Sequence, residues 1–162
     1  MELDDSLEDL ITETSHFACE LYEREVRFID GFLKFHREAT QKYNLKVGLA
    51  TNADTQTLTI TDKKLNLKNL FGEHLYNISH VNEVCKPNPD LYLHAAKKLN
   101  LDPQECIAIE DSAHGIQAAQ SAGIFCIGIN SANTPEQLSK AHFTIDTYDE
   151  IDLPRLLKIP KK

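Results

Sequence analysis

The 162-residue sequence has no tryptophan, a single methionine, six glycines, six prolines and four cysteines. Six glycines exclude a collagen-like repeat, and four cysteines are too few for a disulfide-dense mini-protein. The longest uncharged apolar stretches, such as residues 124–129, are far shorter than the roughly 20 residues that span a bilayer. The first residues, Met-Glu-Leu-Asp-Asp, lack the basic-then-apolar order of a secretory signal. We therefore expect a cytoplasmic protein without a membrane partner.

Positive charge is also scarce, because 17 basic side chains face 25 acidic ones and the net charge is −8. Such a surface repels a phosphate backbone, so we expect no nucleic-acid partner. A local positive site for a small phosphorylated molecule is still compatible with this charge. The cysteines lie too far apart for zinc-ligand spacing, and the seven histidines form no i, i+4 pair. Cys106 and Cys126 lie in apolar runs and are predicted to be reduced core residues.

Hydrophobic periodicity predicts alternating helices and short buried strands. Expected strands are 47–50, 75–78, 106–109, 124–129 and 143–145, and expected helices are 3–22, 31–43, 91–99, 113–122 and 151–157. Residues 53–62 are predicted to be a polar lead into a helix and turn at 65–71. Asp30 is the expected N-cap of the second helix, and Gly123 is expected just past the end of helix 113–122. The alternation predicts an α/β fold, a doubly wound, Rossmann-like parallel sheet in one compact unit.

Polar residues follow three of the predicted strands. Thr51 and Asn52 follow the first, Lys86 lies in the loop after the second, and Glu110 and Asp111 follow the third. Ligands of open α/β sheets bind beyond the carboxyl ends of the strands, so these side chains are expected to converge. Taken singly, Thr-Asn is common turn chemistry, a loop lysine is usually solvated, and an acidic pair often caps the following helix.

Together, these residue types fit a phosphoryl group. The Thr51 hydroxyl and nearby backbone N–H groups, including that of Asn52, donate to phosphate oxygens, and Lys86 neutralises charge. Asp111 and Glu110 offer the oxygen ligands that Mg²⁺ prefers. Positioning and charge neutralisation are most of what phosphoryl transfer requires.

The segments VGLATNAD, CKPNPDLYLHAAKKLN and CIAIEDSAHGIQAAQSAGI resemble the haloacid dehalogenase (HAD) superfamily, in its β-phosphoglucomutase and phosphoglycolate phosphatase-like branch. Thr51 matches the family's second motif, Lys86 the third, and Glu110 with Asp111 the fourth, Mg²⁺-binding motif. The match covers about residues 28–150. Its motifs are weak one by one, but their order and spacing are specific, with 35 residues from Thr51 to Lys86 and 25 from Lys86 to Asp111.

The family's first motif, a strand ending in Asp-x-Asp-Gly, is not found. In that register Phe28 would occupy the position of the aspartate nucleophile and Asp30 that of the general acid/base, and phenylalanine cannot be phosphorylated. By resemblance, the missing strand belongs between strands 47–50 and 106–109. Residues 1–27 are then interpreted as a remnant of a helical cap, and residues 28–162 as a HAD-like core without its first strand.

Three outcomes follow from a missing central strand. The chain is a shortened product of a longer enzyme, which we favour, another chain fills the gap, or the flanking strands pair directly. Self-association, or a partner that supplies the strand, is therefore expected.

By resemblance, the complete enzyme is a Mg²⁺-dependent phosphatase or phosphomutase that acts on a small phosphorylated metabolite through a phosphoaspartate. The chain alone is expected to have little or no turnover. The alternative is a non-catalytic phosphate-binding or regulatory remnant. A haloacid dehalogenase is a weaker reading, because that chemistry needs no Mg²⁺ and the Glu110-Asp111 pair argues against it.

Overall fold

The computed structural model describes residues 20, 23–131 and 135–158, and the fold over these residues is α/β. The predicted helix 3–22 lies outside the described residues except for Glu20. Five strands are described: β1 (Leu49–Ala50), β2 (Leu75–Tyr76), β3 (Ile107–Glu110), β4 (Phe125–Ile129) and β5 (Phe143–Ile145). The α-helices are α2 (Phe32–Arg37), α3 (Thr55–Leu65), α4 (Leu67–Phe71), α5 (Asp90–Leu99), α6 (Ala113–Ser121) and α7 (Leu153–Leu156). Among these residues, no helix has the length and apolar character needed to cross a membrane.

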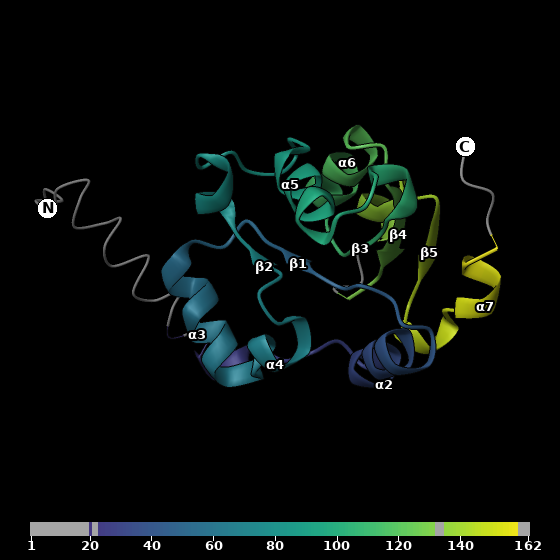
Figure 1. Ribbon diagram of the computed structural model, residues 1–162, viewed down its shortest axis with the longest axis horizontal. Coiled ribbons are helices and arrows are strands. Elements are labelled where there is room, and N and C mark those ends of the chain that lie inside the picture. The colour runs from purple at the N-terminus through teal and green to yellow at the C-terminus, as the bar shows by residue number, and fades with distance from the viewer. Residues whose placement is uncertain (1–19, 21–22, 132–134, 159–162) are drawn as a thin grey trace, which may run out of the picture.

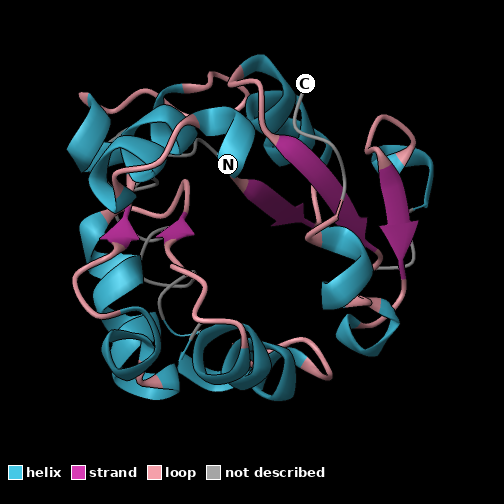
Figure 2. Ribbon diagram, turned by 45° about the vertical axis from the view of Figure 1, so that its right-hand side comes forward, coloured by secondary structure: helices cyan, strands magenta, loops and turns pink. Residues whose placement is uncertain are grey.

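Every strand pair is parallel, as predicted, but the strands form two sheets. One sheet has the order β1-β2 and the other has the order β3-β4-β5. Figure 2 shows these two groups of strands on opposite sides of the interior. Strands β1 and β3 do not pair with each other. Direct pairing of the flanking strands, one of the three outcomes considered above, is therefore excluded in this structure.

Helices cover the β3-β4-β5 sheet on both faces, as Figure 1 shows with α5 and α6 above the strands and α2 below. One apolar cluster packs α6 against the sheet through Ile116, Ala119 and Cys126. A second cluster, on the other face, joins Ala39 and the α7 residues Leu153 and Leu156 to the strand residues Ile127, Ile129 and Ile145. This sheet therefore supplies most of the described core.

Two helix starts differ from the prediction. Helix α2 begins after Gly31, whose backbone φ is +82°, so Asp30 is not its N-cap. Helix α2 then continues as a π-helical turn, Glu38–Lys42. Residues 55–65 form α3 rather than a polar lead, because the Asp54 carboxylate accepts a hydrogen bond from the Thr57 N–H at 2.7 Å and caps the helix. The predicted end of α6 is confirmed, since Gly123 has a φ of +76° just past its last turn.

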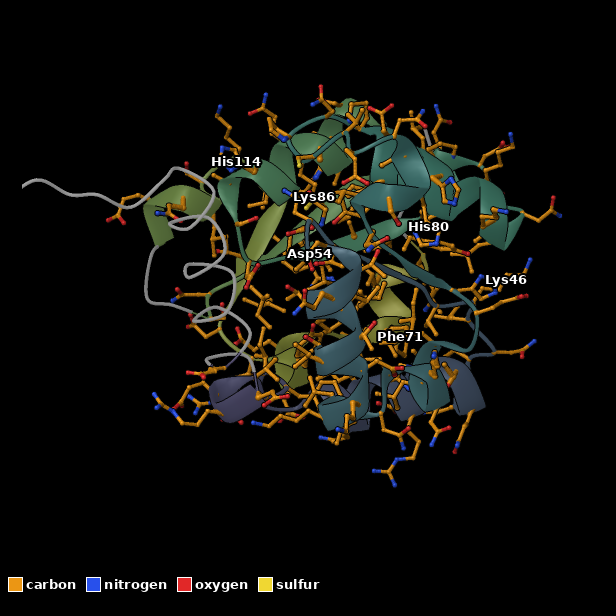
Figure 3. The ribbon with its side chains drawn as sticks, turned by 90° about the vertical axis from the view of Figure 1, so that its left-hand side faces the viewer. Lys46, Asp54, Phe71, His80, Lys86 and His114 are labelled. Carbon is orange, nitrogen blue, oxygen red and sulfur yellow. The ribbon has the colours of Figure 1, made fainter. Side chains whose placement is uncertain are left out.

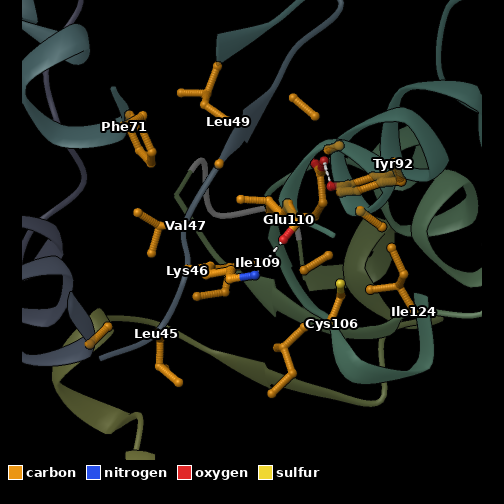
Figure 4. Close-up of a pocket in the computed structure, with 18 of the residues that line it drawn as sticks. Leu45, Lys46, Val47, Leu49, Phe71, Tyr92, Cys106, Ile109, Glu110 and Ile124 are labelled. Carbon is orange, nitrogen blue, oxygen red and sulfur yellow. Dashed lines mark hydrogen bonds between the residues drawn. The ribbon is translucent and has the colours of Figure 1, made fainter. Parts of the chain in front are cut away.

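A cavity of about 1670 Å³ lies between the two sheets. Val47 and Leu49 line it from the β1 side, and Ile107 and Ile109 line it from the β3 side. Figure 4 shows Val47 and Leu49 across the cavity from Ile109 and Glu110. The cavity occupies the place where a single continuous sheet would have a strand between β1 and β3.

Candidate functional site

Lys86 links the two sheets at the carboxyl ends of their strands. Its Nζ donates one hydrogen bond to the carbonyl oxygen of Ala50, the last residue of β1, at 2.9 Å. It donates another to Oε1 of Glu110, the last residue of β3. The side chains of Lys86 and Glu110 are each only 8% exposed. One buried ion pair thus holds the ends of β1 and β3 on either side of the cavity mouth.

The Glu110 carboxylate is held from several sides. The Tyr92 hydroxyl, from α5, donates to Oε1, and the Ser112 hydroxyl lies 3.4 Å from Oε2. Lys86 Nζ also lies 4.7 Å from the centre of the Tyr92 ring, a cation–π arrangement. Burial, and then the negative charge of Glu110, raise the pKa of Tyr92 well above its ordinary value. Tyr92 therefore stays protonated and acts as a hydrogen-bond donor to Glu110.

Gly115, in the first turn of α6, makes room for that carboxylate. A Cβ atom at this position would lie 1.9 Å from Oε2 of Glu110. No side chain fits there unless Glu110 moves, so the glycine is required by a close approach and not by its backbone angle. Ser112 starts the same helix, and its hydroxyl accepts a hydrogen bond from the Gly115 N–H at 3.0 Å.

Thr51 and Asn52 lie in the turn that follows β1 and leads into α3 (Figure 3 labels Asp54 and Lys86 in this region). The Thr51 hydroxyl accepts a hydrogen bond from the Ala53 N–H at 3.1 Å, which is the turn-shaping role weighed above. Because its oxygen is the acceptor there, its own proton is left for another acceptor. Asn52 binds the Lys86 backbone on both sides: Oδ1 accepts from the N–H at 2.8 Å, and Nδ2 donates to the carbonyl at 3.3 Å. The Asn52 side chain thus positions the lysine loop.

The two adjacent acidic residues, Glu110 and Asp111, differ in burial. Glu110 points into the buried cluster, whereas Asp111 is exposed and its Oδ2 accepts a hydrogen bond from the Ser131 hydroxyl at 3.2 Å. The described residues contain no group of three or more His, Cys, Asp or Glu side chains that could hold a metal ion. Mg²⁺, however, commonly takes one or two carboxylates and completes its shell with water and phosphate oxygens. Asp111 and the second oxygen of Glu110 are oxygen donors of that kind, although the two side chains face in different directions.

The residues in register with the missing first motif have other roles. Phe28 stacks on Phe32 with 4.8 Å between ring centres, and Asp30 is exposed before α2. Residues 23–48 form no strand ahead of β1. His114 is exposed in the first turn of α6 (Figure 3). Within the described part of the chain, no aspartate takes the place of the nucleophile.

The comparisons with known proteins identify the family. The family model described as haloacid dehalogenase-like hydrolase matches residues 2–123. This chain belongs to that family. The resemblance stated from the motifs and the Rossmann-like fold are thereby confirmed, and phosphatase-named proteins are among the relatives of this chain.

Three relatives illustrate the relationship. A phosphatase-named protein of Bacillus subtilis, YhcW, is 43% identical over 89 residues, which are 55% of this chain and 40% of that protein. The phosphorylated carbohydrates phosphatase of Thermotoga maritima is 30% identical over 130 residues, 76% of this chain and 56% of that protein. The crystal structure of a family IA, variant 3 HAD hydrolase from Entamoeba histolytica superposes with a TM-score of 0.81 at 29% identity, covering 95% of this chain and 72% of that chain. The chain thus spans about half the length of these curated relatives.

Sequence reasoning missed two members of the site. Tyr92 reads as one more apolar position of helix 91–99, and only its place six residues after Lys86 could have drawn attention to it. The second is the contact of the Asn52 side chain with the Lys86 backbone, because the sequence predicts only a backbone N–H contact and a turn-shaping role for Asn52. The structure brings Lys86 and Glu110 into contact and places the Thr51–Asn52 turn beside them, while Asp111 faces solvent.

Proposed function

We propose that this chain carries the phosphate- and metal-binding part of a Mg²⁺-dependent phosphatase or phosphomutase for small phosphorylated metabolites. The observation that carries the proposal is the Lys86 ammonium, held between the ends of β1 and β3 beside the Thr51–Asn52 turn. The name of the Thermotoga relative, phosphorylated carbohydrates phosphatase, supports this substrate class. A cytoplasmic location remains part of the proposal.

In this proposal each residue has a stated task, and Glu110 has two. Lys86 neutralises the phosphoryl charge, and the Thr51 hydroxyl together with the backbone N–H groups of its turn orients the phosphoryl oxygens. Glu110 and Tyr92 hold the lysine in place. Asp111 and Glu110 would hold Mg²⁺, which when bound neutralises charge and orients a phosphoryl oxygen. Residues 28–162 form this core unit, and residues 1–27 belong to a cap remnant.

The step that breaks the phosphate ester needs a nucleophile, and the described residues include no strand between β1 and β3 that could end in the aspartate of the family's first motif. We therefore propose that the 162-residue chain binds phosphate with Mg²⁺ but turns over little or none by itself. A non-catalytic phosphate-binding or regulatory role is the alternative, and the packing of Phe28 in the nucleophile register favours keeping it.

The test combines titration calorimetry with a turnover assay. Inorganic phosphate titrated into the protein with Mg²⁺ should give saturable binding. Asp111→Asn should weaken the Mg²⁺-dependent part at least fivefold, while Asp30→Asn, a matched change at another exposed aspartate, should not. Release of phosphate from p-nitrophenyl phosphate should stay at the buffer level. Robust Mg²⁺-dependent release would refute the predicted inactivity, and no phosphate binding would refute the proposed site.

A further inference from the structure

The cavity between the sheets is larger than an ordinary ligand pocket. Its volume of about 1670 Å³ exceeds the roughly 300–1,000 Å³ of sites that enclose small molecules. Apolar side chains line both of its long sides, and Ile107 on the β3 side is 38% exposed. A large apolar cavity in the middle of an α/β domain is typical of a binding site for an apolar partner of similar size.

The backbone groups around the cavity indicate what kind of occupant would fit it. The N–H groups of Leu49 and Thr51 donate to the β2-side carbonyls of His74 and Tyr76, each at 2.9 Å. Alternate residues of a strand direct their N–H and C=O groups to opposite sides, so those of Ala50 point away from β2 and toward the cavity. The Ala50 carbonyl there accepts only the Lys86 side chain among the contacts described, and no strand. Likewise, β3 pairs with β4 on one edge alone.

Two facing strand edges define a slot for one more strand. Ala50 and Glu110 end their strands at the same ammonium group, so β1 and β3 have their carboxyl ends together. An inserted strand would therefore be parallel to both. Its length is set by β3, whose four residues span about 13 Å at about 3.3 Å per residue. Both faces of the β3 sheet are covered by core clusters, so the inserted residues should be apolar throughout, as in buried parallel strands.

We propose that this cavity is a docking site for an extended, apolar polypeptide segment of four or five residues from another molecule. The segment pairs in parallel with β1 on one side and with β3 on the other. A rigid small molecule or a lipid chain would fill the apolar space but leave both rows of backbone groups unpaired.

The docking proposal goes beyond the proposed function, because a strand can pair here whether or not phosphate binds. Failure of one proposal therefore does not imply failure of the other.

The test uses the full chain and a fluorescein-labelled peptide whose five central residues alternate Val and Ile, flanked by two lysines on each side. Fluorescence anisotropy should show saturable, one-to-one binding. A peptide of the same length with proline at its central position should bind at least tenfold more weakly, because proline removes a ladder donor. In ¹⁵N-labelled protein, the bound peptide should shift the amide signals of the cavity-lining strands β1 and β3 more than those of β5.

A matched pair of variants locates the site. Ile107→Asp places a charge on the cavity wall and should weaken peptide binding at least tenfold. Leu93→Asp makes the same change at a similarly exposed position, 42% against 38%, on α5 and away from this cavity, and should change binding less than twofold. Both positions are exposed, so both variants are expected to fold, which circular dichroism checks.

Four results would overturn the proposal. The first is no binding at 1 mM peptide, and the second is equal affinity for the proline peptide, which would mean non-specific apolar contact. A third is a concentration-dependent dimer whose dissociation alters the same amide signals, since a second copy would then occupy the cavity. The fourth is strong exchange protection of the Ala50 and Ile107 amides without peptide, because β1 and β3 would then pair directly.

Discussion

The two halves of the β-structure, the β1-β2 sheet and the β3-β4-β5 sheet, differ in how regular their strands are. Strand β4, with a neighbour on each side, has five residues, and its Cys126, Ile127 and Ile129 are at most 1% exposed. Strand β1 has a neighbour on one side only, and both of its residues are half-buried. Since a buried parallel strand needs partners on both edges and both faces, regular strand length reflects neighbours as much as local sequence.

The link between these halves is the buried Lys86–Glu110 pair, and breaking it should have the largest effect. Lys86→Met leaves a buried carboxylate without its cation and should lower the free energy of unfolding by about 4 kcal/mol. Urea unfolding followed by circular dichroism measures this change. Adding Glu110→Gln to Lys86→Met should recover part of the loss, because the unpaired charge is removed.

Lys34→Met is the matched control for that prediction. Lys34 forms an ion pair with Asp149 at 2.6 Å, but the two side chains are 70% and 58% exposed. Exposed pairs contribute about 0–1 kcal/mol, so this variant should unfold almost as the parent does. Equal losses for Lys86→Met and Lys34→Met would contradict the view that the central pair joins the halves.

The difference in packing can be tested by replacing one large apolar side chain with alanine in each half. Ile127→Ala, at a fully buried position of β4, should cost about 3 kcal/mol because it opens a new void in a filled core. Leu49→Ala, in β1, should cost only about 1 kcal/mol, since its side chain already borders the cavity. Thermal unfolding of both variants provides the measurement. A larger loss for Leu49→Ala would mean that the cavity is closed in solution.

A smaller effect is expected at the contact between α6 and the end of β3. Gly115→Ala forces the Glu110 carboxylate away from the new Cβ atom and should destabilise the protein by about 2 kcal/mol. Gln117→Ala, at an exposed position of the same helix, should be neutral or slightly stabilising because alanine is the better helix former. If both variants unfold at the parent's urea midpoint, Glu110 has room to move and the tight fit is refuted.

The last prediction concerns pH and the better-packed half, and its effect is negligible near neutral pH. Burial, and then the charge of Glu110, raise the pKa of the Cys126 thiol to about 12, from an ordinary value of 9.0. The unfolded chain therefore loses this proton first, so stability should fall as pH rises from about 9 to about 12, by up to about 1.4 kcal/mol per pH unit. Urea midpoints measured across this range should decline less steeply in Cys126→Ala. Cys85→Ala, at an exposed thiol, should leave the slope unchanged.

Much of the fold could be predicted because its signals are local. The apolar spacing of residues 91–99 and the run 143–145 predict α5 and β5 almost residue for residue. Helix α3 was missed because its sequence is rich in threonine and polar residues, and its start depends on a cap at Asp54. The shortness of β1 was beyond local reasoning, since it depends on which strands are next to it in space.

For the site, the sequence predicts only that its side chains lie close together. Placing Lys86 and Glu110 at the carboxyl ends of strands was enough to expect them close together. This reasoning could not show that Glu110 points inward to the lysine while Asp111 points outward. The directions of two adjacent side chains at the end of a strand depend on the local backbone, which the sequence does not specify. The Tyr92 hydroxyl and the Asn52 amide were missed for a related reason, since both act through contacts with Lys86 or its partner that exist only after folding.

The close approach of Gly115 to Glu110 has a consequence for how this chain can change over generations. A longer side chain at position 115 becomes acceptable only after position 110 shortens, and shortening position 110 first leaves Lys86 without its partner. Each substitution is therefore expected to destabilise the protein when it comes first. The two positions are expected to change together, because a single change at either one lowers stability.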